Sequence, residues 1–199
     1  MKNIVLNILS SYLKIFSEEK DRQSILTNYI ETHNDTEIID WNNFNGHIVT
    51  GGFIYALEEK KFLVLHHKDL DMYLYPGGHV DDTDKNPLEA SIREVHEETG
   101  LYDLTQLTIS KNTLVPIDID THKVPYNKRL NLPEHYHFDF RYLFVIDKIE
   151  DVSIDTEEAS DYKWIDITEL YNDPNYGKIV YKIEQILFNE ESKNKKTIK

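Results

Sequence analysis

The sequence contains no cysteine, and this absence excludes disulfide bonds and thiol chemistry. It also lacks any apolar run close to the roughly 20 residues that a membrane-spanning helix needs. Positive charge is scarce, since 22 Lys and Arg residues face 36 Asp and Glu residues and leave a formal net charge of −14. This balance argues against a nucleic-acid polymer or an anionic membrane as the main partner. A small phosphorylated molecule remains an acceptable substrate if metal ions supply the positive charge.

The first 45 residues are predicted to form an N-terminal helical extension. Residues 1–16 are apolar but interrupted by Asn7 and Lys14, and they lack a small-residue cleavage site. We therefore interpret them as an amphipathic helix rather than a signal peptide, which favours a cytoplasmic protein. Ser17 is expected to cap a second helix. Because no catalytic group is evident in this pair, its apolar stripes are expected to serve packing or the contact of a homodimer.

The period of the hydrophobic pattern changes to two at His47, which predicts strands. The predicted strands cover residues 47–57, 61–67, 72–75, 104–109, 112–118, 135–146 and 162–166. Residues 119–133 are interpreted as a long surface loop of functional interest. A short helix is expected at 167–171 and a C-terminal helix at about 175–190, before a flexible tail at 192–199. Mixed strands with helices between them place the chain in the α/β class.

The helix that follows the third predicted strand carries a cluster of acids. Asn86 is predicted to cap its N-terminus and Gly100 to end it. Between them, Glu94, Glu97 and Glu98 recur at helical spacing and share one face. Taken alone, such acids are typical of a solvated helix face, but like charges at this spacing destabilise a helix, so a positive group is expected among them. Mg²⁺ or Mn²⁺, which prefer oxygen ligands, would fill that role.

The segment around this helix resembles the signature of the Nudix hydrolases, G-x5-E-x7-R-E-U-x-E-E-x-G-U with U aliphatic. Residues 93–101 (REVHEETGL) match its second half at every fixed position, and Gly78 matches the opening glycine. The first half departs from the pattern, because Asp84 stands where the family has Glu and eight residues rather than seven separate it from Arg93. The sequence leaves open whether Asp84 or Glu89 takes the part of that first Glu.

The resemblance implies a Nudix-type α/β/α sandwich with a mixed sheet over residues 46–191, preceded by the helical extension. It also implies hydrolysis of the pyrophosphate linkage of a nucleoside diphosphate joined to another moiety, by attack of water on phosphorus. Shorter phrases resemble a bacterial branch of the family that has such an extension: GHIVT at 46–50, HHK at 66–68, PGGHV at 76–80 and the His137-x-Asp139 pair.

Roles for individual residues follow from the resemblance. The implied ligands of Mg²⁺ or Mn²⁺ are Glu94, Glu97 and Glu98; the alternative for one of the three is to orient or deprotonate the attacking water. Glu94, Glu97 and Arg93 are the catalytic candidates, with Arg93 holding a carboxylate in position. Gly77 and Gly78 would let the backbone approach the substrate phosphates without interference from a Cβ atom.

Three further candidate residues lie outside the signature. The strand at 135–146 alternates strictly and places His135, His137 and Asp139 on one face. His137 and Asp139 are our preferred substrate-binding residues; a His-x-His pair that binds metal and a polar edge in water are the alternatives. Glu158 is a candidate extra acid for the metal or the water, and a solvated acidic turn is the alternative there.

Two other functions remain open at this point. The second interpretation is an isopentenyl diphosphate isomerase, an enzyme with a similar fold. The absence of cysteine argues against it, because that chemistry is associated with a cysteine in the active site. A non-catalytic nucleotide-binding regulator is the third interpretation, although a degenerate member is expected to lose glutamates that this chain retains. No residue distinguishes one phosphorylated substrate from another, so the sequence predicts a reaction class without a substrate.

Overall fold

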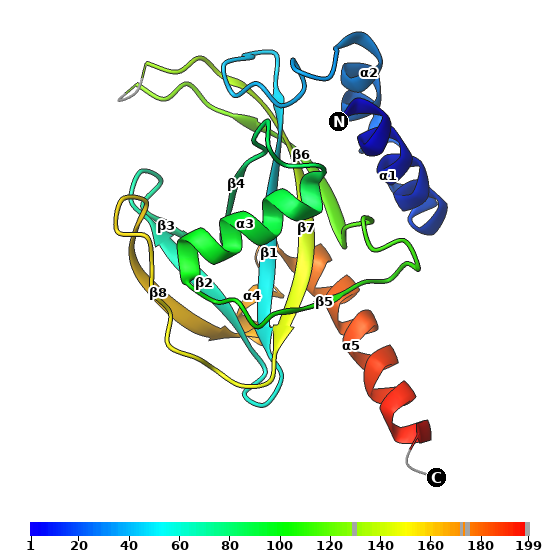
Figure 1. Ribbon diagram of the computed structural model, residues 1–199, viewed down its shortest axis with the longest axis vertical. Helices are drawn as coiled ribbons and strands as arrows, with labels where there is room; N and C mark the ends of the chain where they lie inside the picture. The colour runs from blue at the N-terminus through cyan, green and yellow to red at the C-terminus, as the bar shows by residue number, and fades with distance from the viewer. Residues whose placement is uncertain (129–130, 172, 174–175, 198–199) are drawn as a thin grey trace.

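The described chain forms a mixed eight-stranded sheet with helices on both faces (Figure 1), as the resemblance implied. The computed structural model describes residues 1–128, 131–171, 173 and 176–197, with side chains described as far as residue 188. The helical elements are α1 (Lys2–Ile15), the 3₁₀ turn η1 (Ser17–Glu19), α2 (Ser24–Thr32), α3 (Pro87–Thr99), α4 (Ile167–Leu170) and α5 (Gly177–Thr197). The strands are β1 (His47–Ala56), β2 (Lys61–His67), β3 (Met72–Leu74), β4 (Gly77–His79), β5 (Thr105–Leu107), β6 (Asp118–Val124), β7 (His135–Ile146) and β8 (Ala159–Asp166).

The centre of the sheet is a parallel pair formed by β1 and β7. Their register runs from His47 opposite His137 to Ala56 opposite Ile146. The other strand pairs in the described chain are antiparallel. At the end where β1 and β7 begin, β4 pairs with β1 and β6 pairs with β7. Four strands therefore lie in the order β4-β1-β7-β6 at this end of the sheet.

Alternation along the central strands divides the core into two layers, because successive side chains of a strand point to opposite faces. Phe138 and Phe140 of β7 pack with apolar residues of α1, α2 and α3. Leu143 and Val145 of the same strand pack with residues of α4 and α5. The sheet is thus covered on both faces, and Figure 1 shows α3 lying across one of them.

The ends of α3 follow the sequence prediction. The Asn86 side chain accepts a hydrogen bond from the backbone N–H of Glu89 at 3.0 Å, and Pro87 occupies the first helical position. Gly100 ends the helix with a φ of 68°, a left-handed conformation that favours glycine. The Glu89 carboxylate accepts from the backbone N–H of Lys85 at 3.2 Å, one residue before the cap. Local residue chemistry therefore sets both ends of the helix that carries the acids.

The N-terminal extension packs on the sheet. The ring of Tyr29 in α2 lies 4.6 Å from that of Phe138 in β7. The side-chain amide of Gln23 donates to the carbonyl of Ile119 in β6 at 2.6 Å. The prediction that Ser17 caps the second helix is wrong, because Ser17 begins η1 and Gln23 stands at the N-cap of α2. Packing is thus one use of these apolar stripes, and a homodimer contact stays a prediction.

The prediction for residues 112–133 is wrong in part. Residues 112–117 do not form the expected strand, whereas β6 occupies the start of the expected surface loop. β6 pairs with β7 from Asp118 opposite Arg141 to Val124 opposite His135. The hydrophobicity pattern did not indicate this strand, because Asp118 and Asp120 both pair with Arg141 of β7 instead of with apolar side chains.

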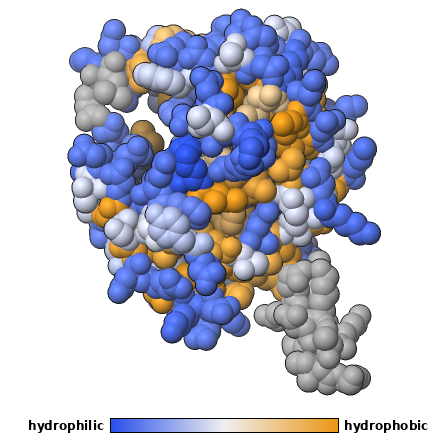
Figure 2. Space-filling view, in the orientation of Figure 1, coloured by the Kyte–Doolittle hydropathy of each residue, from blue (hydrophilic) through white to orange (hydrophobic). Residues whose placement is uncertain are grey.

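The C-terminal helix is longer than predicted, since α5 continues to Thr197. The predicted flexible tail at 192–199 therefore begins within helical backbone, residues 198–199 lie outside the described residues, and the flexibility stays a prediction. No helix in the described ranges is both long and apolar enough to span a bilayer. Figure 2 shows hydrophilic residues over the upper and lower parts of the face toward the viewer, with apolar residues between them.

Deletion of residues 1–40 is expected to destabilise the protein. The truncated chain would expose buried side chains such as Phe138, which now contacts Tyr29. Burying one such side chain contributes about 1.5–3 kcal/mol to the free energy of unfolding. Exposure of as few as two such side chains should therefore lower the melting temperature by roughly 6 °C or more. Thermal melts and size-exclusion chromatography of both chains measure this. An unchanged melting temperature and elution volume would contradict the packing role.

Candidate active site

Two glycines of β4 lie against glutamates of α3. The backbone N–H of Gly77 donates to Oε1 of Glu98 at 3.0 Å. A Cβ atom added to Gly78 would lie 2.7 Å from Cδ of Glu94, closer than atoms can approach without movement. Glycine at these positions therefore lets the carboxylates reach the backbone of the strand. The structure brings together four residues that the sequence analysis placed at one site.

Arg93 connects the acids of this segment. Its Nε and Nη2 atoms donate to the two carboxylate oxygens of Asp84 at 3.3 and 2.9 Å. Its Nη1 atom donates to Glu94 at 2.8 Å and to Glu97 at 3.0 Å. Glu89 turns instead toward the loop before the helix. Of the two acids that the sequence left open for the first Glu of the signature, Asp84 pairs with Arg93 and Glu89 does not. It does so although one extra residue separates it from Arg93.

The carboxylates of Glu94 and Glu98 are held in an environment that disfavours their charge. Burial raises the pKa of Glu94 to about 7, against the lowering effect of Arg93, and the charges of Glu97 and Glu158 add to the rise. Burial also raises the pKa of Glu98 to about 8, and Glu158 and Glu94 contribute, although the N–H of Gly77 opposes them. A cation placed among these oxygens would reverse the effect.

The three glutamates predicted as metal ligands are not equivalent. Glu94 and Glu98 are partly buried, whereas the side chain of Glu97 is 58 % exposed and pairs with Arg93. All the candidate donors are carboxylate oxygens. The carboxylates of Glu94 and Glu98 are desolvated and repel each other. Hard divalent cations such as Mg²⁺ and Mn²⁺ prefer oxygen donors of this kind. The residues present therefore fit such an ion.

Glu158 lies close to the glutamates of α3, in a loop that packs against the end of the helix. The backbone N–H of Asp155 donates to the carbonyl of Glu98 at 3.3 Å, and the carbonyl of Glu158 accepts from the N–H of Lys68 at 2.9 Å. The charge of Glu158 raises the pKa of both Glu94 and Glu98. Its role as an extra acid stays a prediction, and its position near Glu94 and Glu98 is compatible with that role.

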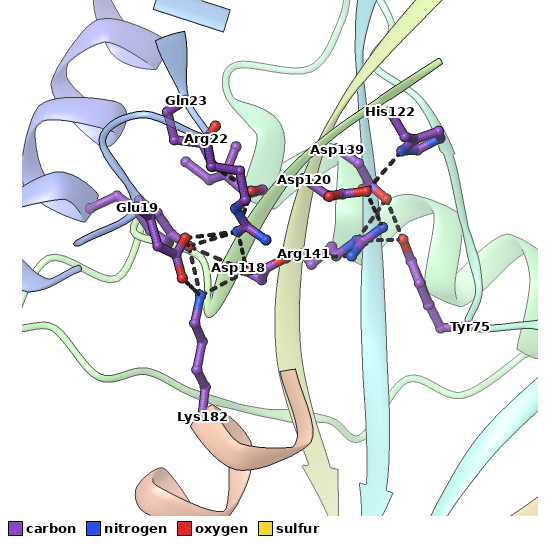
Figure 3. Close-up of polar contacts among 12 residues, drawn as sticks. Glu19, Arg22, Gln23, Tyr75, Asp118, Asp120, His122, Asp139, Arg141 and Lys182 are labelled. Carbon is purple, nitrogen blue, oxygen red and sulfur yellow. Dashed lines mark hydrogen bonds and ion pairs between the residues drawn. The ribbon is translucent and has the colours of Figure 1, made fainter. Parts of the chain in front are cut away.

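His137 and Asp139 lie on one face of β7, as predicted, but in different surroundings. Asp139 accepts hydrogen bonds from the hydroxyl of Tyr75 and from Nε of Arg141 (Figure 3). His137 lies nearer the start of the strand, within hydrogen-bond distance of His135. Contact of either residue with a substrate stays a prediction.

The sequence analysis assigned no role to two histidines that lie beside His137. His47 stands directly opposite His137 in the β1–β7 register, and His79 ends the strand that carries Gly77 and Gly78. Both appear in the sequence within the short phrases noted above. Their proximity follows from strand pairing over long sequence separations, so local spacing carried no signal for it.

A cavity of about 370 Å³ lies elsewhere, between the N-terminal extension and α5. Phe16, Glu19, Tyr181 and Lys182 are among its lining residues. None of the predicted site residues lines it, so it does not contribute to the site around α3.

Comparisons with known proteins agree with this geometry. A family profile described as NUDIX domain matches residues 47–183, well over half of the chain. A curated protein from Lactococcus lactis subsp. cremoris (strain MG1363), named probable DHNTP pyrophosphohydrolase, is 34 % identical over 93 residues. That match covers 47 % of this chain and about half, 51 %, of the relative.

Solved structures show the same fold. A crystal structure of a Nudix-family hydrolase from Clostridium perfringens matches with a TM-score of 0.52 and 25 % identity, over 71 % of this chain and 95 % of the other. A Caenorhabditis elegans Ap4A hydrolase in a binary complex matches with a TM-score of 0.53 and 20 % identity, over 71 % and 98 % of the two chains. With the profile match over residues 47–183, these findings show that the chain belongs to the Nudix hydrolase family.

Proposed function

We propose that this protein is a metal-dependent pyrophosphohydrolase, which cleaves the diphosphate linkage of a nucleoside diphosphate derivative by attack of water on phosphorus. The observation that carries the proposal is the cluster of desolvated carboxylates, Glu94 and Glu98, against the glycine backbone of β4. Glu158 extends the cluster from a separate loop. The proposed setting is the cytoplasm, with Mg²⁺ or Mn²⁺ as the cofactor.

Each residue has a defined task in this proposal. Glu94, Glu97 and Glu98 would hold the ion, which neutralises phosphate charge and lowers the pKa of a bound water. Arg93 keeps the carboxylates of Glu94 and Glu97 in place through the hydrogen bonds described above. Glu158 is proposed to orient or deprotonate the attacking water.

The backbone and the polar face of β7 complete the proposed site. Gly77 and Gly78 leave space for phosphate oxygens, because no Cβ atom projects from this strand segment. His137 and Asp139 are proposed to contact the organic part of the substrate. A homodimer is retained as a proposal for the assembled state.

The first substrate to test is dihydroneopterin triphosphate, since the curated Lactococcus relative is named for it. A panel should add Ap4A, which the name of the C. elegans hydrolase points to. ADP-ribose and isopentenyl diphosphate test the general class and the isomerase alternative. Release of pyrophosphate or a mononucleotide supports the proposal, whereas binding of nucleotides without turnover of any panel member would favour the regulator.

Removal of divalent metal is expected to abolish turnover. The carboxylates of Glu94 and Glu98 repel each other and the substrate phosphates unless a cation lies between them. Activity measured after treatment with a chelator and dialysis should fall to background and return with excess Mg²⁺ or Mn²⁺. Full turnover in metal-free buffer would contradict this mechanism.

A further inference from the structure

A second cluster of ligand-type side chains lies near the ends of three strands and contains histidines only. His47 begins β1, His79 ends β4 and His137 lies near the start of β7. One nitrogen atom from each of the three rings can be chosen so that all lie within 4.8 Å of one another. The centroid of the His47 ring lies 5.1 Å from that of the His79 ring and 4.8 Å from that of the His137 ring.

Strand register explains how three distant residues meet. His47 and His137 are directly paired, so their side chains share a face of the sheet. His79 pairs with Val49, two residues along β1 from His47, and therefore lies on the same face. Three adjacent strands thus present one imidazole each on the same face, with His79 offset by two residues along β1.

The ring of His47 is buried without matched partners for its polar atoms in the described part of the chain. Only 1 % of the residue is exposed, and among the described residues neither Nδ1 nor Nε2 has a partner at hydrogen-bond geometry. The nearby backbone of Asn43 still favours the charged ring. A buried polar atom without a partner costs roughly 1–3 kcal/mol, so native structures usually pair such atoms with protein, water or an ion. The His47 ring is therefore in an environment that an additional ligand would complete.

The neighbouring histidine orients His137. His135 donates from Nδ1 to the carbonyl of Pro133 at 2.8 Å, because a carbonyl oxygen can only accept. With both rings neutral, Nε2 of His135 then accepts from Nε2–H of His137 at 3.1 Å. This arrangement leaves Nδ1 of His137 unprotonated and able to act as a ligand. Histidines that bind metals are typically oriented by such a hydrogen bond from the other ring nitrogen.

The charge state of the cluster also suits a metal rather than an anion. Burial and the neighbouring histidines lower the pKa of His47 to about 4 and that of His137 to about 2. His79 exposes part of its surface, but desolvation of its ring and the charge of His135 still lower its pKa. The rings are thus neutral near pH 7, and neutral imidazole is the form that binds metal ions.

We propose that His47, His79 and His137 bind a transition-metal ion of the Zn²⁺ class, at a site separate from the carboxylates of α3. Imidazole nitrogen suits Zn²⁺, whereas Mg²⁺ requires oxygen donors. Zn–N bonds of about 2.0–2.1 Å place the donors of a tetrahedral ion about 3.3 Å apart, so the cluster contracts by up to about 1.5 Å on binding. The ion would join β1 and β7 to β4, the strand that carries Gly77 and Gly78.

The test is calorimetric titration of the full chain with ZnCl₂, after chelator treatment and dialysis, in buffer with saturating Mg²⁺ to occupy the carboxylates. The parent is expected to bind one Zn²⁺ per chain. His79→Gln and His137→Gln are expected to weaken that binding at least about 10–100-fold, the effect known for residues that merely orient ligands. Co²⁺ provides a second readout, because its visible absorption distinguishes tetrahedral nitrogen ligation from octahedral oxygen ligation.

Two variants serve as controls. His33→Gln removes a histidine that stacks on Tyr29 in the N-terminal extension, and Glu98→Gln removes a carboxylate of the α3 site. Both should bind Zn²⁺ like the parent. Thermal melts without Zn²⁺ check that each variant is folded. Because His79 is exposed, its substitution should not disturb the core, so His79→Gln decides the test if His137→Gln is unstable. Absence of Zn²⁺ binding by the parent, unchanged binding by His79→Gln, or loss of binding by Glu98→Gln would each overturn the proposal.

Discussion

Glu98→Gln is expected to lower kcat by about 10²–10³-fold with the fold intact, which corresponds to roughly 2.7–4 kcal/mol of lost electrostatic stabilisation. Glutamine retains the shape of the side chain and the acceptor for the N–H of Gly77 at 3.0 Å. It removes one negative charge from a desolvated site that is proposed to hold a divalent cation. The loss should therefore appear in kcat at saturating Mg²⁺ as well as in the affinity for the metal.

Glu89→Gln is the matched control on the same helix. Its carboxylate contacts the backbone and the side chain of Lys85, outside the cluster formed by Glu94, Glu98 and Glu158. The expected loss of kcat is under tenfold. Both variants should be assayed with the best substrate of the panel, with thermal melts to confirm folding. A Glu98→Gln enzyme with full activity would remove the proposed mechanism, and equal losses would place Glu89 in the site despite its contacts.

Asp118→Asn is expected to lower the free energy of unfolding by about 3 kcal/mol or more, because it breaks a buried ion cluster. Asp118 is fully buried and pairs with Arg22 at 2.6 Å, Lys182 at 2.7 Å and Arg141 at 3.4 Å (Figure 3). Burial opposes its ionisation, but these three cations outweigh it and lower its pKa. Loss of the central charge would leave buried cations with less compensation, and urea denaturation measures the cost.

The control for this variant is an exposed ion pair between β6 and the residue that precedes β7. Lys123 and Glu134 lie 2.7 Å apart with side chains that are 51 % and 59 % exposed. Exposed pairs of this kind contribute roughly 0.2–1 kcal/mol, so Glu134→Gln should destabilise the protein by no more than that. If Asp118→Asn cost as little as Glu134→Gln, the cluster would not join β6 to the extension and to α5 as the contacts indicate.

The elements that the sequence predicted well are those whose signals are local. The caps of α3 depend on Asn86, Pro87 and Gly100, which act within a few residues of one another. The strict alternation of β7 appears in the sequence because aromatic residues fill one face of the strand. β6 was missed because Asp118 and Asp120 stand on either side of the buried Ile119, and their pairing with Arg141 of β7 is not visible in a hydrophobicity pattern.

The sequence by itself determined the helix that carries the acids and the presence of Glu94, Glu97 and Glu98 on one face, because helical spacing of 3.6 residues per turn decides these. It also determined the α/β class, because strands of period two alternate with helical patterns. Tertiary structure decided that Asp84 pairs with Arg93, and that Glu158 lies near the glutamates. It also decided the histidine cluster at the ends of three strands. Strand register and loop packing join residues far apart in the chain, and no local pattern encodes which of them will meet.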